Sequence, residues 1–202
     1  MATNIKDGVL FYKVITIGCY GIGKTSLIKK YCNQPDAKEP FDSLKRSTQV
    51  KNTNCDVVMW DTQGMEEISS ITSFYYNDAH GALIMADLSN PEGLDDFKEW
   101  IESLSYYESK EVAKQPIKIA VGTKADQQKV DDEKLKSIAE ECGIKWFKIS
   151  NTTGEGVEEL MNTLLTDMNE KFNPGMGEGK KKGGKQKEAG NKKEKKGGCV
   201  LL

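Results

Sequence analysis

The sequence predicts a three-layer α/β fold, in which a mainly parallel six-stranded sheet is covered by helices on both faces. Segments with strand character alternate with segments of helical periodicity up to about residue 172. Residues 81–87 and 117–122 are continuous apolar runs, which are typical of strands buried on both faces. A glycine-rich loop between the first strand and the first helix is the third indication.

The individual elements follow from these patterns in chain order. The expected strands are residues 10–17, 47–51, 55–60, 81–87, 117–122 and 145–149, with a hairpin turn at the polar link 52–54. The expected helices are residues 25–32, the region around 97–104, and residues 131–142 and 156–171. Two prolines and weak periodicity predict a loop at residues 33–43.

Composition limits the class of protein. The 202 residues are 37% apolar and 30% charged, and they contain no apolar run long enough for a transmembrane helix. The first residues lack the apolar segment of a secretory signal, so we expect a cytosolic protein. The five cysteines are scattered, which argues against a disulfide framework or a zinc site.

Charge divides the chain into a domain at residues 1–172 and a tail at residues 173–202. The tail has nine lysines and three glutamates, a net charge of +6, which leaves −8 for the domain because the whole chain carries −2. An acidic domain is a poor candidate for general nucleic-acid binding, whereas the basic tail suggests an anionic membrane as partner. The Lys- and Gly-rich tail is expected to be disordered.

A phosphate-binding loop is predicted where Gly18, Gly23, Lys24 and Thr25 fit the pattern G-x-x-x-x-G-K-[ST]. Backbone N–H groups of such a loop point at phosphate oxygens; the expected binding residues are Gly21, Ile22, Gly23, Lys24, Thr25 and Ser26. Lys24 would reach the β- and γ-phosphates, and the Thr25 hydroxyl would bind Mg²⁺. The flanking strand and helix disfavour the alternative, a glycine-rich turn that binds nothing.

Two further groups of residues follow strand ends. Asp61 is expected to bind Mg²⁺ through a water, and the Gly64 N–H would sense the γ-phosphate, although a plain strand-end turn is the alternative. Asp126 would accept two hydrogen bonds from guanine, at places where adenine has no donors.

The remaining residues of the predicted base site flank Asp126 or follow the last strand. The Lys124 stem would cover the base, and backbone N–H groups from Ser150, Asn151 and Thr152 would meet the guanine O6. All of these residues lie at the carboxyl ends of strands, where open α/β sheets bind ligands. They predict GTP or GDP with Mg²⁺.

The chain resembles the Ras-superfamily small GTPases, and most closely the Rab branch. The resemblance spans residues 8–172 and the extreme C-terminus, and it is strongest at residues 60–62, 74–81 and 153–160. It implies a G domain that hydrolyses GTP to GDP and phosphate, with switch loops at residues 33–46 and 62–76. It also implies effector, exchange-factor and GTPase-activating partners and a role in vesicle traffic or signalling. His80, the only histidine, is expected to be structural.

Several residues depart from the family pattern. Met65 occupies the place of the glutamine that orients the attacking water, and whether Gln63 can replace it is open. Tyr20 stands where the loop usually has a small residue, and Thr123 replaces the usual asparagine of the guanine motif. We therefore expect guanine binding to survive and intrinsic hydrolysis to be slow.

The Mg²⁺-binding threonine of the first switch also lacks an obvious counterpart. Ser43 is the best match, with Ser47 or Thr48 as alternatives.

The chain ends in Cys199-Val200-Leu201-Leu202, a pattern that favours a geranylgeranyl group on Cys199. The lysines between residues 180 and 196 would add the second membrane signal, although such lysine runs also mark nuclear import. The predicted location is the cytoplasmic face of an intracellular or plasma membrane, with a cytosolic pool.

Two alternatives for the function remain. One is a GTP-binding interaction module with little hydrolysis, which Met65 and Tyr20 favour. The other is an ATP-dependent P-loop enzyme such as a small kinase, against which Asp126 argues.

Overall fold

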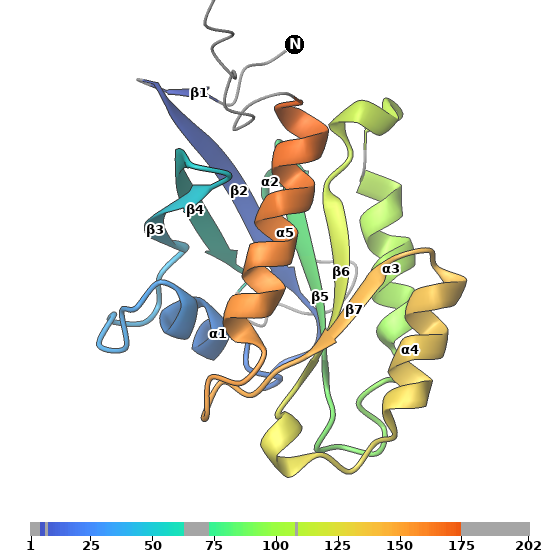
Figure 1. The fold of residues 1–202 in the computed structure, drawn as a ribbon. Coiled ribbons are helices and arrows are strands. Elements are labelled where there is room, and N and C mark those ends of the chain that lie inside the picture. Colours follow the sequence, from blue (N-terminus) through green and yellow to red (C-terminus); the bar gives the residue numbers. More distant parts are fainter. Residues whose placement is uncertain (1–4, 7, 63–72, 108, 175–202) are drawn as a thin grey trace, which may run out of the picture.

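The computed structural model of the chain describes residues 5–6, 8–62, 73–107 and 109–174 (Figure 1). These residues form a seven-stranded sheet in the order β3-β4-β2-β5-β6-β7, with β1 paired to β2 beside this path. The strands are β1 Ile5–Lys6, β2 Val9–Ile17, β3 Ser43–Val50, β4 Thr53–Asp61, β5 Gly81–Asp87, β6 Ile117–Thr123 and β7 Lys145–Lys148. The helices are α1 Lys24–Tyr31, α2 Ser73–Tyr76, α3 Phe97–Tyr107, α4 Asp132–Glu141 and α5 Val157–Phe172, with 3-10 turns at Val112–Lys114 and Ala125–Gln127.

The sheet is mainly parallel, as predicted. Strand β2 pairs in parallel with β4 and β5, and the parallel pairing continues from β5 to β6 and from β6 to β7. Only the β3–β4 and β1–β2 pairs are antiparallel. The prediction of six strands is confirmed, and β1 adds a seventh that is too short to show any periodicity in the sequence.

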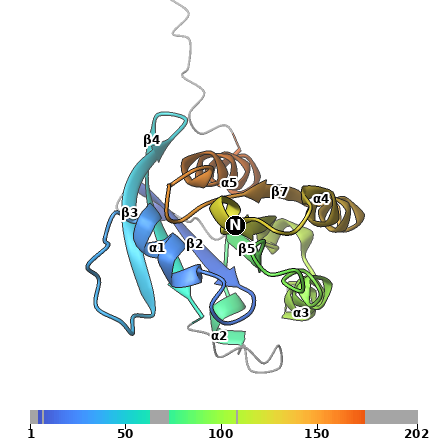
Figure 2. The ribbon, with the colours of Figure 1, turned by 90° about the horizontal axis from the view of Figure 1, so that it is seen from below.

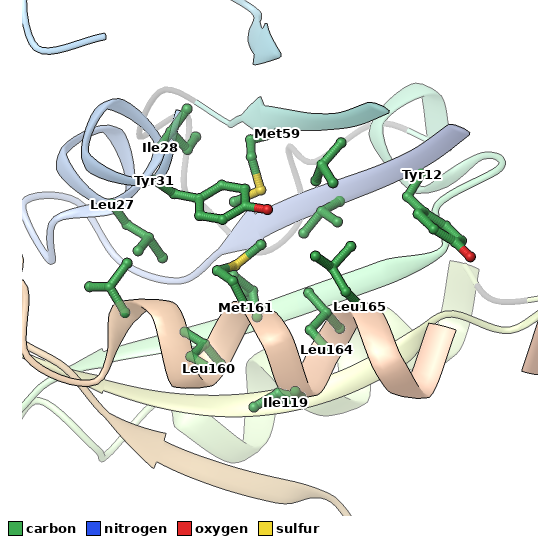
Figure 3. Packing of buried hydrophobic residues seen from close by; sticks show 14 of the residues in the cluster. Tyr12, Leu27, Ile28, Tyr31, Met59, Ile119, Leu160, Met161, Leu164 and Leu165 are labelled. Atoms are coloured by element: carbon green, nitrogen blue, oxygen red, sulfur yellow. The ribbon is translucent and has the colours of Figure 1, made fainter. Parts of the chain in front are cut away.

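Helices cover both faces of the sheet and complete the three layers (Figures 1 and 2). One buried cluster joins α1 and α5 to the sheet, and it includes Leu27, Met59 and Met161. Figure 3 shows these side chains in the layer between the helices α1 and α5 and the strands β2 and β4. The second cluster, on the other face, includes Phe97 and Trp100 of α3. Burial of these apolar side chains is the main stabilising contribution to the fold.

The hairpin between β3 and β4 differs from the prediction. Its turn consists of Lys51 and Asn52, which have φ angles of 46° and 63°, and β4 already begins at Thr53. Two consecutive left-handed residues form the kind of tight turn that matches the twist of paired strands. At its other end β3 begins at Ser43, so that residues 43–46 of the predicted switch loop 33–46 belong to a strand.

The end of α5 is attached to β2 by buried polar groups. The Tyr12 hydroxyl donates to Asn169 Oδ1 at 3.2 Å and accepts from Asn173 Nδ2 at 2.9 Å. The His80 ring lies edge-on to both Tyr12 and Phe172, with centroid distances of 5.6 and 5.1 Å. These contacts fix the last turn of α5 against the amino-terminal ends of the central strands.

None of the helices in the described part of the chain combines the length and hydropathy that crossing a bilayer requires.

Candidate nucleotide-binding site

The predicted phosphate loop connects β2 to α1, and two of its glycines are required by its shape. Gly18 has a φ of 132°, and a Cβ there would lie 2.4 Å from the Met85 carbonyl oxygen. Gly23 has a φ of 99° and precedes α1 without a side-chain cap. The first N–H groups of α1 are therefore available to an anion, and the helix dipole favours negative charge there.

Lys24 lies inside this loop. Its side chain is buried, and Nζ donates to the carbonyl oxygens of Gly18 at 2.9 Å and Cys19 at 2.8 Å. The loop thus curls around the ammonium group, the point charge predicted to contact the β- and γ-phosphates. Ile22 packs into the core, whereas Gly21 and Ser26 are exposed.

The two predicted metal-binding groups with the clearest motifs are brought together. Thr25 Oγ1, in the first turn of α1, donates to Asp61 Oδ2 at 2.6 Å from the end of β4. A hydroxyl and a carboxylate are oxygen donors of the kind that Mg²⁺ prefers, so these residues fit the ion. No group of three or more His, Cys, Asp or Glu side chains within the described ranges resembles a metal site.

Ser43, the residue predicted to bind Mg²⁺ from the first switch, does not lie beside Thr25 and Asp61 in the way that they lie beside each other. Ser43 pairs with Trp60, so strand alternation directs its side chain to the face of the sheet opposite Asp61. Its neighbour Asp42 is close to the metal residues through its backbone, because its carbonyl accepts from the Asp61 N–H at 3.0 Å. Binding of Mg²⁺ by Ser43 stays a prediction, and it requires the start of β3 to separate from β4.

The two alternatives to Ser43 lie farther from Asp61 in this structure, and they too stay predictions. Ser47 pairs with Asp56 and Thr48 pairs with Cys55, five and six residues along β4 from Asp61. At about 3.3 Å per residue this separation is roughly 16–20 Å. The Ser47 hydroxyl is moreover bonded to Asp56 at 2.6 Å.

Thr123 and Lys124 hold neighbouring loops together. Thr123 is fully buried at the end of β6, and its hydroxyl lies 2.7 Å from the Ile22 carbonyl and 3.0 Å from that of Ala86. The hydroxyl therefore ties the phosphate loop to β5 and β6. Lys124 Nζ bonds Asp87 Oδ2 at 2.6 Å across the ends of these strands. Burial raises the pKa of Asp87, but hydrogen bonds from Lys124 and Ser89 outweigh it and hold the pKa below its usual range.

Asp126 lies exposed in the 3-10 turn after β6. A hydrogen bond from the Ser150 hydroxyl lowers the pKa of its carboxyl group, so it is ionised at neutral pH. An exposed, ionised carboxylate can accept hydrogen bonds from the two N–H groups on one edge of guanine. The loop that carries Asp126 is joined to the end of β7 by the Ala125 N–H, which donates to the Ile149 carbonyl at 3.0 Å.

The loop after β7 contributes side chains as well as backbone. Ser150 is buried and accepts from the Thr153 N–H at 3.1 Å, and Thr152 is exposed. Asn151 Nδ2 donates to the Gly23 carbonyl oxygen at 2.9 Å, which brings this loop onto the phosphate loop. The sequence places Asn151 after a strand but has no signal for this side-chain contact.

The contact between the phosphate loop and α3 likewise has no signal in the sequence. Trp100 Nε1 donates to Cys19 Sγ at 3.4 Å, and Sγ lies 3.7 Å from Asp96 Oδ2. The next residue, Tyr20, leaves 84% of its surface exposed, so its ring is accessible to a bound molecule or protein.

Four predicted residues lie outside the described part of the chain: Gln63, Gly64, Met65 and Cys199. Apart from Ser47 and Thr48, the other residues predicted to bind nucleotide or metal lie at the carboxyl edge of the parallel strands. A family model, that of the Ras family, matches residues 13–170 and therefore spans all of these loops.

Proposed function

Because the chain belongs to the Ras family of small GTPases, we propose that it is a membrane-anchored GTP/GDP switch with slow intrinsic hydrolysis. Vesicle traffic or related signalling is the proposed setting, with effector, exchange-factor and GTPase-activating proteins as partners. The strongest support for the proposed switch is that residues from distant parts of the sequence lie together at the predicted nucleotide site. Lys24, the Thr25–Asp61 pair and the Asp126–Ser150 pair meet at one edge of the sheet.

The proposed binding mode assigns each loop a task. The N–H groups at the start of α1 and the Lys24 ammonium would hold the phosphates, and Asp126 would accept from the guanine N1–H and exocyclic amine. Thr25 and Asp61 would hold Mg²⁺, which when bound neutralises charge on the β- and γ-phosphate oxygens.

Hydrolysis requires one water, which attacks the γ-phosphorus. As the new P–O bond forms, the bond between the γ-phosphorus and the β–γ bridging oxygen breaks. The products are GDP and inorganic phosphate. Positioning of that water accounts for much of the acceleration in this reaction. The Met65 thioether is a weak acceptor without a donor, so it cannot orient water through two hydrogen bonds. Slow hydrolysis follows from this residue.

Nucleotide identity is the decisive test of the proposal. We expect the purified full chain to retain GDP or GTP, and unlabelled GDP to displace a fluorescent GDP analogue while ATP at the same concentration does not. Asp126→Ala should weaken GDP binding by roughly a hundredfold, because two N–H donors of the guanine would lose their charged acceptor. Equal displacement by ATP would instead support an ATP-dependent enzyme.

A second candidate is a GTP-binding interaction module that scarcely hydrolyses its ligand. The 84% exposure of Tyr20 favours it, because an aromatic ring on the phosphate loop is suited to contact a partner and to obstruct an incoming catalytic group. Single-turnover hydrolysis with an added excess of Mg²⁺ distinguishes the two. Conversion of bound GTP to GDP within minutes to hours supports the switch, whereas unchanged GTP after a day supports the module.

A further inference from the structure

Two adjacent carbonyl groups of the phosphate loop are held by side chains from the two base-binding loops. Thr123 donates to the Ile22 carbonyl at 2.7 Å, and Asn151 Nδ2 donates to the Gly23 carbonyl at 2.9 Å. The Gly23 carbonyl also accepts the first hydrogen bond of α1, from the Leu27 N–H at 2.9 Å. Asn151 therefore bonds directly to the group that begins the helix on which the phosphates would rest.

The packing around Asn151 is close. A Cβ on Gly23 would lie 2.9 Å from Asn151 Nδ2, so the amide fills the space beside the loop. Its other polar atom, Oδ1, is buried and has no hydrogen-bond partner among the described residues. A buried acceptor without a donor is costly and calls for an explanation, and a donor that arrives with a bound molecule or its water would relieve that cost.

Two hydrogen bonds, joined by the peptide bond between Ser150 and Asn151, connect the two halves of the site. Asp126, which would bind the base, is bonded to Ser150, and Asn151 follows Ser150 in the chain and bonds to Gly23. Loss of the Asn151 bond would allow the base loop and the first turn of α1 to move apart. A nucleotide contacting both parts would then leave more easily.

We propose that the Asn151 side chain couples the base-binding loop to the phosphate loop and thereby sets the rate at which the nucleotide leaves. This inference rests on the proposed nucleotide site. It assigns Asn151 as a positioning residue that acts through Gly23, in addition to any contact made by its backbone.

The dissociation rate of a fluorescent GDP analogue from the full chain, chased with excess GDP, tests the proposal. Asn151→Ala is expected to release the analogue about tenfold faster, which corresponds to about 1.4 kcal/mol. Asn151→Asp keeps the shape but sets an oxygen against the Gly23 carbonyl, so its release should be faster still. Asn162→Ala, a matched change at an exposed position on α5, should release the analogue at the wild-type rate.

A comparison of GDP with GMP separates coupling from a local structural defect. GMP keeps the base but lacks the β-phosphate, so Asn151→Ala should weaken GDP binding several-fold more than GMP binding. Equal weakening of both nucleotides would overturn the proposal, and so would release rates within twofold of wild type for both Asn151 variants. Failure of the wild-type chain to bind GDP would instead refute the proposed function itself.

Discussion

Met65 is the single residue from which we expect the largest effect on turnover. A glutamine side chain can donate to and accept from the attacking water, whereas a thioether can do neither well. We predict that Met65→Gln raises the single-turnover rate of GTP hydrolysis at least tenfold while the affinity for GDP stays within about twofold. Met176→Gln, the same change beyond α5, serves as the control. An unchanged rate for Met65→Gln would show that Tyr20 or another feature limits hydrolysis.

His80 makes the stability of the domain sensitive to acid. Its ring is packed between Tyr12 and Phe172, and its Nδ1 accepts from the Lys13 backbone N–H at 3.1 Å. Burial lowers its pKa from 6.5 to about 4, despite the nearby Asp78 carboxylate. The unfolded chain therefore binds a proton first as the pH falls, and stability is lost between pH 6.5 and about 4.

We predict that the free energy of unfolding decreases by roughly 2 kcal/mol between pH 7.5 and pH 5. Urea unfolding of the GDP-loaded domain at the two pH values measures this difference. His80→Gln, which has no titrating group, should remove most of the pH dependence in this range. A decrease of the same size in that variant would assign the effect to other groups.

At the scale of the elements, Arg46 joins three segments that are distant in the sequence. It is the only arginine of the chain, and its guanidinium donates to the Tyr31 carbonyl at 2.9 Å and to Glu158 at 2.7 Å. Its Cζ also lies 4.5 Å from the centre of the Tyr31 ring. It thereby connects β3, the end of α1 and the start of α5.

We predict that Arg46→Lys lowers the free energy of unfolding by about 1 kcal/mol, because an ammonium group can neither stack on the ring nor present a rigid pair of donors. Glu158→Ala should cost less than about 0.5 kcal/mol, since the ion pair with this exposed carboxylate is screened by solvent. Urea unfolding of the two variants tests the ranking. The reverse order would show that the ion pair matters more than the contacts with Tyr31.

Elements whose structure is determined by their own residues could be predicted from the sequence, whereas contacts between distant segments could not. Continuous apolar runs identified β5 and β6, and the glycine-rich motif located the Gly18–Thr25 loop, because each pattern reflects the needs of its own segment. The extent of β3 was underestimated because Ser43 to Arg46 are held by pairing with β4, and no local pattern marks that pairing. The same reason applies to Asn151, whose bond to Gly23 joins residues 128 positions apart.

At the scale of the whole molecule, the acidic domain and the basic tail have opposite electrostatic roles. A net charge of −8 repels an anionic surface, whereas nine lysines attract it with roughly 1 kcal/mol each when they lie close to the lipid headgroups. One prenyl chain alone binds only reversibly. The proposed anchor therefore needs both the lipid on Cys199 and the lysines.

We predict that the geranylgeranylated full chain co-floats with vesicles containing about one quarter phosphatidylserine and is released by at least half in about 0.5 M salt. Cys199→Ser should abolish co-flotation. Vesicles of neutral lipid provide the matched control, and equal binding to them would show that the lysines contribute nothing.

The attachment of α5 at Tyr12 and His80 has a geometric consequence for such an anchor. The helix runs from the base loop at one pole of the domain to Phe172 at the other (Figure 1). Its 16 residues span about 24 Å. The end of α5 thus lies at the pole opposite the loops predicted to bind the nucleotide. The proposed lipid anchor would therefore be attached through the pole opposite the predicted nucleotide loops, and it would leave those loops accessible to regulator proteins.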